Sequence, residues 1–126
     1  MVAHTPLGAG MLTGQRQIKS LDDMSANDYH RFFPRFQPDN FEKNLQLVAK
    51  LDEMAAKKLC TTAQLALSWI KAHGRREGMP VIIPVPGARL KQRVVENATD
   101  IPLFEADMAE IKAILDKLTR ILNYKN

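Results

Sequence analysis

Apolar residues recur every three or four positions in two stretches of the chain, and this spacing predicts amphipathic helices. One helix is expected from Asn40, which can cap it, to about Leu59, and another from about Glu105 to Leu122. The apolar positions that define their inner faces are Phe41, Leu45, Val48, Leu51, Met54, Ala55 and Leu59, followed by Met108, Ile111, Leu115, Leu118 and Leu122. Each helix therefore needs an apolar partner along one side.

The segment AQLALSWIKAH predicts a third helix that is apolar on nearly every side. Thr61 and Thr62 precede it as candidate caps, and Gly74 follows it as a stop signal. No charged residue occurs between positions 63 and 70. Such a helix is stable only with neighbours on most of its faces, so Trp69 is expected in the core.

Two short apolar stretches lack helical spacing and predict buried strands. One is MVAHTPLG at the start of the chain, and the other is the run Val81–Ile83 within GMPVIIPVPGA. Pro84 and Pro86 have no amide hydrogen, so the strand ladder should weaken there. A short helix over ARLKQRVVENA follows the second strand. Alternation of strands and helices predicts a parallel α/β architecture.

The segment from Gly8 to about Asp39 is polar, without clear periodicity, and too long for an ordinary connection. Phe32, Phe33 and Phe36 are too apolar to remain in water, so this loop is expected to pack against the body of the protein. His30 and His73 stand among polar residues and are expected to be solvated.

Composition indicates one globular domain that covers residues 1–126. The chain is 45% hydrophobic and 25% charged, and it contains no run of about 18 apolar residues that could span a membrane. The opening residues are too short and too weakly basic for a secretory signal. A single cysteine, Cys60, excludes an internal disulfide and suits a reducing compartment. A cytoplasmic location is therefore expected.

The net charge of +4 raises the question of an acidic partner. The basic residues form short, scattered clusters, which favours a small anionic ligand over nucleic acid. The three histidines lack the spacing of metal ligands, so no metal site is expected.

The ends of the two expected strands carry the chemistry that such an anion needs. Gly8 and Gly10 follow the first strand and allow backbone amides to approach a ligand closely. Gly87 follows the second strand and precedes a helix start, where backbone amides favour anions. Arg89 and Arg93 are expected one turn apart on one helix face, and guanidinium groups match phosphate geometry. The sequence thus predicts a pair of phosphate-binding corners.

Four segments resemble the aldo/keto reductase family. HTPLGAGMLTG resembles the family's YSPLGxGxLTG segment, and IPVPGARLKQRVVENATDIPL resembles its IPIPGTxxxxxxxEN cofactor segment. NDYHRFFPRFQPDNFEKNLQLV and CTTAQLALSWIKAHG are similar to the branch that includes pyridoxal reductases and YakC-like enzymes. The resemblance implies the C-terminal half of a (β/α)8 TIM barrel: the last two strands, their helices and the C-terminal helix.

The resemblance also implies how the chain would bind NADP(H). The first segment would lie over the pyrophosphate and ribose, and the second would hold the 2′-phosphate and the adenine. The residues that match are His4, Thr5, Pro6, Leu7, Gly8, Gly10 and Leu12, followed by Gly87, Ala88, Arg89, Arg93, Glu96 and Asn97.

Several positions depart from the family pattern. His4 replaces a tyrosine that stacks on the nicotinamide, so stacking should be weaker and dependent on protonation. Ala88 removes a phosphate contact, and Phe104 replaces the usual cap of the last helix, a loss that burial of its ring could offset. The family's catalytic Asp, Tyr, Lys and His lie on earlier strands. Tyr29 and Tyr124 match neither the motif nor the position of that tyrosine, so no catalytic residue is assigned.

Two functions remain open at this point. The first is an NADP-dependent oxidoreductase, in which the complete enzyme transfers hydride between NADPH and a small aldehyde or ketone. The second is a non-catalytic, truncated NADP-binding or interaction fragment. A basic nucleic-acid module is a weaker third possibility. Because barrel units bury their faces against neighbouring units, the isolated chain is expected to melt broadly or to self-associate through exposed barrel faces.

Overall fold

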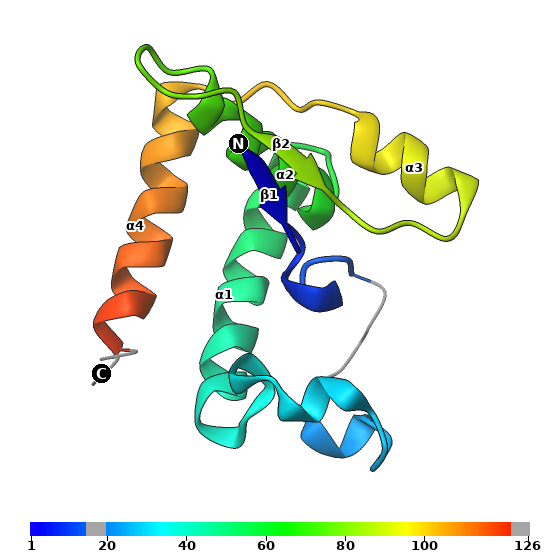
Figure 1. Ribbon diagram of the computed structural model, residues 1–126. Helices are drawn as coiled ribbons and strands as arrows, with labels where there is room; N and C mark the ends of the chain where they lie inside the picture. Colours follow the sequence, from blue (N-terminus) through cyan, green and yellow to red (C-terminus); the bar gives the residue numbers. More distant parts are fainter. Residues whose placement is uncertain (15–19, 122–126) are drawn as a thin grey trace.

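The computed structural model describes residues 1–14 and 20–121, with side chains described as far as residue 117 (Figure 1). It contains two strands, four α-helices and four short 3-10 helices among these residues. Their bounds are β1 Val2–His4, η1 Gly8–Gly10, η2 Leu21–Asp23, η3 Tyr29–Phe32, η4 Pro34–Phe36, α1 Pro38–Lys57, α2 Thr62–Gly74, β2 Ile83–Val85, α3 Lys91–Ala98 and α4 Glu105–Ile121. Two inner-face positions expected for the last helix, Leu118 and Leu122, lie outside the described side chains.

The two strands pair in parallel, as the alternation of elements predicted. Residues 2–4 pair with residues 83–85, and the amide of Ile83 donates to the carbonyl of Met1 at 2.9 Å. The prediction that both strands are buried was wrong: in the first, Met1 and Val2 are exposed, and the second is open as well. Val81 precedes β2 and is 70% exposed, and Ile83 is 57% exposed. Helices cover only one face of this small sheet, so its apolar residues are not enclosed.

Pro84 lies inside β2, opposite Ala3, although proline was expected to weaken the ladder. In a parallel pair, alternate residues direct their amides to the same neighbour. Since Ile83 donates to β1, the nitrogen of Pro84 faces the opposite edge, where no strand of the described residues lies. The missing donor therefore disturbs no pairing, as is usual for proline in edge strands.

A hydrophobic core forms where α1, α2 and α4 meet, behind the strands in Figure 1. Its buried members are Leu51, Met54, Ala55, Leu65 and Ile111. The apolar stripes predicted for the first and last helices supply most of it. Trp69 packs against this cluster but is only partly buried, so its ring lies at the edge of the core.

The first long helix begins and ends earlier than its pattern predicted. Gln37 occupies the N-cap and Pro38 the first helical position, where its missing amide does no harm. Asn40 is not the cap, because its side chain donates to the carbonyl of Pro34 at 2.9 Å. Leu59 was assigned to the inner face, yet it follows the helix with a φ of 55° and is 95% exposed.

The end of α1 is a Schellman motif with leucine in the position that usually holds glycine. The amide of Cys60 donates to the carbonyl of Ala55, and that of Leu59 donates to the carbonyl of Ala56. Left-handed backbone is unfavourable for a residue with a Cβ atom.

We therefore expect Leu59→Gly to raise the free energy of unfolding by about 0.5–1 kcal/mol. Glycine adopts the left-handed conformation without a steric penalty, although its greater freedom in the unfolded chain offsets part of the gain. Urea denaturation followed by circular dichroism measures the change. Leu59→Ala is the control, since alanine keeps the Cβ atom and removes only an exposed side chain. Equal stabilisation by alanine and glycine would contradict this explanation.

The sequence signals for α2 are confirmed. The hydroxyl of Thr61 accepts a hydrogen bond from the amide of Gln64, whose side chain accepts one from the amide of Thr61 in return. Thr62 lies inside the helix and donates its hydroxyl to Asp52 of α1. At the other end, a Cβ atom on Gly74 would lie 2.6 Å from the backbone nitrogen of Ile82. Glycine is required there because the backbones approach so closely.

The long loop packs against the body through one phenylalanine rather than three. Phe36 is 3% exposed and joins Phe41 in a small core, whereas Phe32 is 84% exposed. Phe33 is also exposed, at 38%. The expectation that His30 is solvated was wrong: it is 6% exposed, and its Nδ1 lies 2.6 Å from Asp28 Oδ1. The acceptor two residues earlier allows a histidine to be buried here.

The start of α4 retains half of a capping box. The carboxylate of Asp107 accepts a hydrogen bond from the amide of Phe104 and pairs with Lys58 at 2.9 Å. The hydrogen bond from Lys58 lowers the pKa of Asp107 below its ordinary value, and the hydrogen bond from the amide of Phe104 adds to this effect. The ring of Phe104 is 70% exposed, so it does not replace the missing cap by burial.

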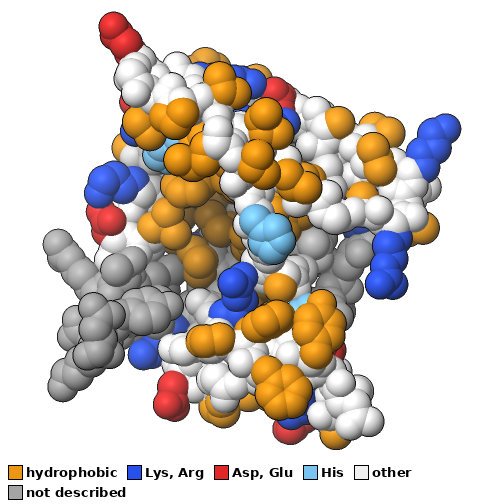
Figure 2. Space-filling view, viewed as in Figure 1, with side chains coloured by type: hydrophobic (Ala, Val, Ile, Leu, Met, Phe, Trp, Pro, Cys, Tyr) orange, Lys and Arg blue, Asp and Glu red, His pale blue; other side chains and the backbone are white. Residues whose placement is uncertain are grey.

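One face of the sheet is left open. In Figure 1, α1 and α2 lie behind the strands, α4 lies to one side and α3 to the other. Figure 2, from the same viewpoint, shows hydrophobic side chains gathered over the strands. The most exposed of these residues include Met1, Val2, Val81, Ile83 and Val85. None of the described helices has both the length and the apolarity to cross a membrane.

Candidate functional site

The two glycine turns, one at residues 8–10 and the other at residue 87, line one cleft of about 780 Å³. β1 and β2 are parallel neighbours, so the turns that follow them lie at the same end of the sheet, beyond the carboxyl ends of both strands. The lining residues are Leu7, Ala9, Gly10, Thr13, Tyr29, Ala63, Gly87, Ala88, Arg89, Leu90, Arg93 and Asn97. The structure therefore places the two predicted phosphate-binding turns in one cleft.

The first turn concentrates left-handed backbone. Thr5, Gly8, Ala9 and Gly10 have φ angles of 52°, 62°, 57° and 92°. A β-branched residue such as Thr5 rarely adopts this conformation. Strain of this kind is characteristic of sites where backbone must be presented to a ligand. Short hydrogen-bonded turns fix the strained segment, including one from the amide of Gly10 to the carbonyl of Leu7 at 3.2 Å.

His4 ends β1 beside this turn and is exposed. Its Nδ1 shares a hydrogen bond of 2.6 Å with the hydroxyl of Thr5. That contact holds the ring near the end of the strand. His4 does not line the cleft itself, nor do Thr5, Pro6, Gly8 and Leu12. These expected site residues therefore lie on or under the first turn rather than in the cleft wall.

Arg35 also lies close to the first turn. Its Nη1 is 3.7 Å from the position that a Cβ atom on Gly8 would occupy. The residue belongs to η4 and is exposed. A Cβ atom at position 8 would make an ordinary contact with this guanidinium, so the left-handed backbone is what favours glycine there.

At the second turn, Arg89 and Arg93 both line the cleft but not as two residues of one helix face. The helix α3 begins at Lys91 with Leu90 as its N-cap, so Arg89 belongs to the preceding turn. The prediction of a shared helical face was wrong in this detail. Arg89 is exposed and has no ion pair among the described residues. Its guanidinium is therefore accessible to an anion in the cleft.

Arg93 connects the two turns. Its Nη1 lies 2.6 Å from Glu96 Oε2, and it also donates to the carbonyl of Thr13 at 3.5 Å. The ion pair is largely buried, with side-chain exposures of 28% for Arg93 and 15% for Glu96. Arg93 is thus partly neutralised by Glu96 and fixes the geometry of the cleft, a role that its position in the sequence alone did not indicate.

Glu96 does not line the cleft but has one polar atom without a partner. Its Oε1 is buried and accepts no hydrogen bond among the described residues. An unsatisfied buried carboxylate oxygen is unfavourable. Asn97, the next residue, lines the cleft and can both donate and accept hydrogen bonds.

Tyr29 lines the cleft from the long loop, and no glycine motif identified it. Ala9, Ala63 and Leu90 complete the wall with apolar surface. Ala63 comes from α2. The absence of charged residues from positions 63–70 was the sequence feature that predicted burial of this helix. The signal for Tyr29 was only its aromatic surroundings in the sequence.

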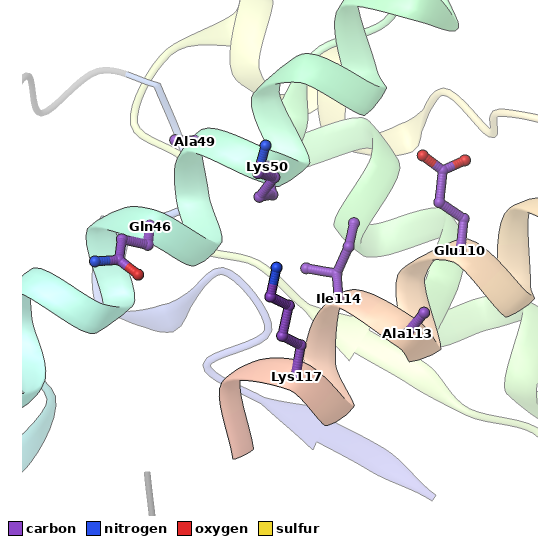
Figure 3. Close-up of a pocket in the computed structure, with 7 residues that line it drawn as sticks. All are labelled: Gln46, Ala49, Lys50, Glu110, Ala113, Ile114 and Lys117. Carbon is purple, nitrogen blue, oxygen red and sulfur yellow. The ribbon is translucent and has the colours of Figure 1, made fainter. Parts of the chain in front are cut away.

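A separate groove of about 560 Å³ lies between α1 and α4 (Figure 3). Ile114 and Lys117 extend from α4 toward α1 in this view. Gln46, Ala49 and Lys50 line the opposite side. Within the described residues, no set of three His, Cys, Asp or Glu side chains is grouped to hold a metal ion.

Comparison with known proteins identifies the family. The model of the aldo/keto reductase family matches residues 1–116. This chain belongs to the aldo/keto reductase family. The fold of that family is a (β/α)8 barrel, and a helix-rich α/β chain with two parallel strands is consistent with part of one.

Curated relatives match nearly all of this chain. It is 39% identical to aldo-keto reductase str7 of Strobilurus tenacellus over 93% of the chain, and 38% identical to aldo-keto reductase yakc [NADP(+)] of Schizosaccharomyces pombe over 92%. An aldo-keto reductase of Gibberella moniliformis is 34% identical over 93% of the chain. The chain spans about one third of the length of these relatives, 33–34%, rather than the half that was expected.

Proposed function

We propose that this chain is the cofactor-binding segment, residues 1–126, of an NADP-dependent oxidoreductase. It would correspond to the last two strands of the family barrel, their helices and the C-terminal helix. The observation that carries the proposal is the single cleft that unites the two glycine turns with Arg89, Arg93 and Asn97. The name of the relative from Schizosaccharomyces pombe includes NADP(+), which supports the same cofactor for this chain.

The residues present fit a phosphorylated dinucleotide. The Gly10 and Gly87 turns border the cleft with backbone, and nothing lies within 4 Å of a Cβ atom built on Gly87. Arg89 supplies an accessible positive charge, and Asn97 offers donors and an acceptor to the edge of a base. The fit therefore rests on charge, space and hydrogen-bonding capacity together.

Each turn has a distinct task in this proposal. The first turn would lie over the pyrophosphate, with His4 beside the nicotinamide and Thr5, Pro6, Leu7, Gly8 and Leu12 shaping that end. Gly87, Ala88 and Arg89 would bind the 2′-phosphate, because a guanidinium offers paired donors to phosphate oxygens. Arg93 would fix the shape of the cleft through Thr13 and Glu96, so that Glu96 acts through Arg93, while Asn97 would contact the adenine edge.

The proposal extends to the chemistry of the complete enzyme. NADPH, when bound, supplies the hydride that reduces an aldehyde or ketone. This chain would orient the cofactor at the carboxyl end of the strands, where ligands lie in barrels of this class. No catalytic acid or base is assigned to it. The alternative is an NADP-binding or interaction fragment without catalysis, which would have the same cleft.

Equilibrium titration of the purified chain with NADPH and NADH tests the proposal. Saturable NADPH binding that is at least about tenfold tighter than NADH binding is expected, since one charged hydrogen-bonded contact contributes about 1.5–3 kcal/mol. Raising the salt concentration should reduce the preference, because it depends in part on screened charge. Absence of NADPH binding by a folded chain would reject the cofactor role. Carbonyl reduction by the pure chain would instead show that catalytic residues lie within it.

A further inference from the structure

We propose that Tyr29 is a further nucleotide-binding residue whose ring stacks on the adenine of the bound dinucleotide. The inference rests on the proposed function but concerns a residue outside both glycine motifs. Tyr29 lines the cleft together with Arg89, Arg93 and Asn97. It would thereby make the long loop part of the nucleotide site.

The backbone around Tyr29 is held firmly in place. Arg31 donates hydrogen bonds to three carbonyl groups, those of Leu21, Met24 and Ser25, at 2.5–2.9 Å. The carboxylate of Asp28 accepts a hydrogen bond from the amide of His30 and so caps η3. These contacts fix the segment on both sides of Tyr29, so its position in the cleft wall is built into the fold.

The ring of Tyr29 is itself packed on one side. Its centroid lies 4.1 Å from that of the buried His30 ring, with an angle of 33° between the planes. The ring of Phe33 packs nearly perpendicular to it, with the two ring centroids 5.8 Å apart and an angle of 84° between the planes. The side chain nevertheless remains 63% exposed. An aromatic ring that is supported by neighbours and still open to the cleft offers a preorganised flat surface.

The chemistry of the neighbours favours adenine as the group that covers this surface. Arg89 provides charge for a phosphate, and Asn97 provides donors and an acceptor for the edge of a base. A purine between such groups presents a broad apolar face, and stacking on an aromatic side chain stabilises it. A small carbonyl substrate has no comparable face and no need of the cleft's arginines.

The test uses the purified chain and two probes, NADPH and adenosine 2′,5′-bisphosphate, which contains only the adenosine end. Tyr29→Ala is expected to weaken binding of both probes about fivefold to tenfold, the lower range for loss of a base–aromatic stack. Tyr29→Phe keeps the ring and should stay within about twofold of the original affinity. Phe32→Ala is the matched control, because Phe32 is in the same 3-10 helix, is 84% exposed and does not line the cleft. It should change neither affinity.

Each other outcome overturns the proposal in a recognisable way. Unchanged binding by Tyr29→Ala removes the stacking role, and a loss for NADPH alone places the ring at the nicotinamide end. An equal loss in Tyr29→Phe assigns the effect to the hydroxyl. If the original chain binds neither probe, the proposed function itself fails. Nuclear Overhauser contacts between the Tyr29 ring and the adenine H2 and H8 protons provide a second measurement that requires no variant, and their absence in the saturated chain contradicts stacking.

Discussion

Replacing Arg89 by alanine is expected to weaken NADPH binding about tenfold to a hundredfold and to leave NADH binding nearly unchanged. Arg89 lines the cleft, is exposed and has no ion pair among the described residues, so its charge is available to the 2′-phosphate. NADH lacks that group. Paired titrations with the two cofactors measure the effect, and equal losses for both would reject a phosphate-specific role.

Arg93→Ala serves as the contrasting variant. Arg93 is engaged with Glu96 and with the carbonyl of Thr13, so its loss should disturb the cleft itself and weaken both cofactors. The two arginines are therefore expected to differ in selectivity, although both line the same cleft. Loss of NADPH binding alone in Arg93→Ala would instead assign the 2′-phosphate to Arg93.

Truncation of Leu65 to alanine is expected to lower the free energy of unfolding by about 2–5 kcal/mol. The side chain is 1% exposed and packs where α1, α2 and α4 meet, so its removal leaves a cavity in the main core. Urea denaturation of the purified chain measures the loss. Leu59→Ala removes the same atoms at a site that is 95% exposed and should change stability by less than about 0.5 kcal/mol. Similar losses at the two positions would show that the core is not packed as described.

The parts of the fold that local signals determine were predictable from the sequence. The helix α2 is capped by Thr61 and ends at Gly74 as expected, and the capping box at Thr61 involves only residues three positions apart. The inner faces of the long helices followed from periodicity. The strands were placed less well, since an apolar run such as 81–83 does not reveal whether anything covers it.

The candidate site also has features that local sequence patterns predicted and features that they did not. Its glycine turns and arginines were recognisable as motifs, and the parallel pairing of the strands brings them into one cleft. The hydrogen bond of Arg93 to the carbonyl of Thr13 and the place of Tyr29 depend on contacts between distant elements, which no local pattern encodes. The prediction for His30 was wrong for a different reason. A polar neighbour in the sequence suggests exposure to solvent, whereas Asp28 is the partner that permits burial of the ring.

The pairing of β1 with β2 also bears on how the chain is made. The register joins residues 2–4 to residues 83–85, far along the chain. At about 5–20 residues per second, a ribosome would need on the order of 4–16 s after making β1 to complete the strand that pairs with it. Throughout that interval, the apolar residues of β1 have no sheet partner from β2. The two strands therefore form a contact of high sequence separation, and such contacts slow folding because a long loop must close before they form.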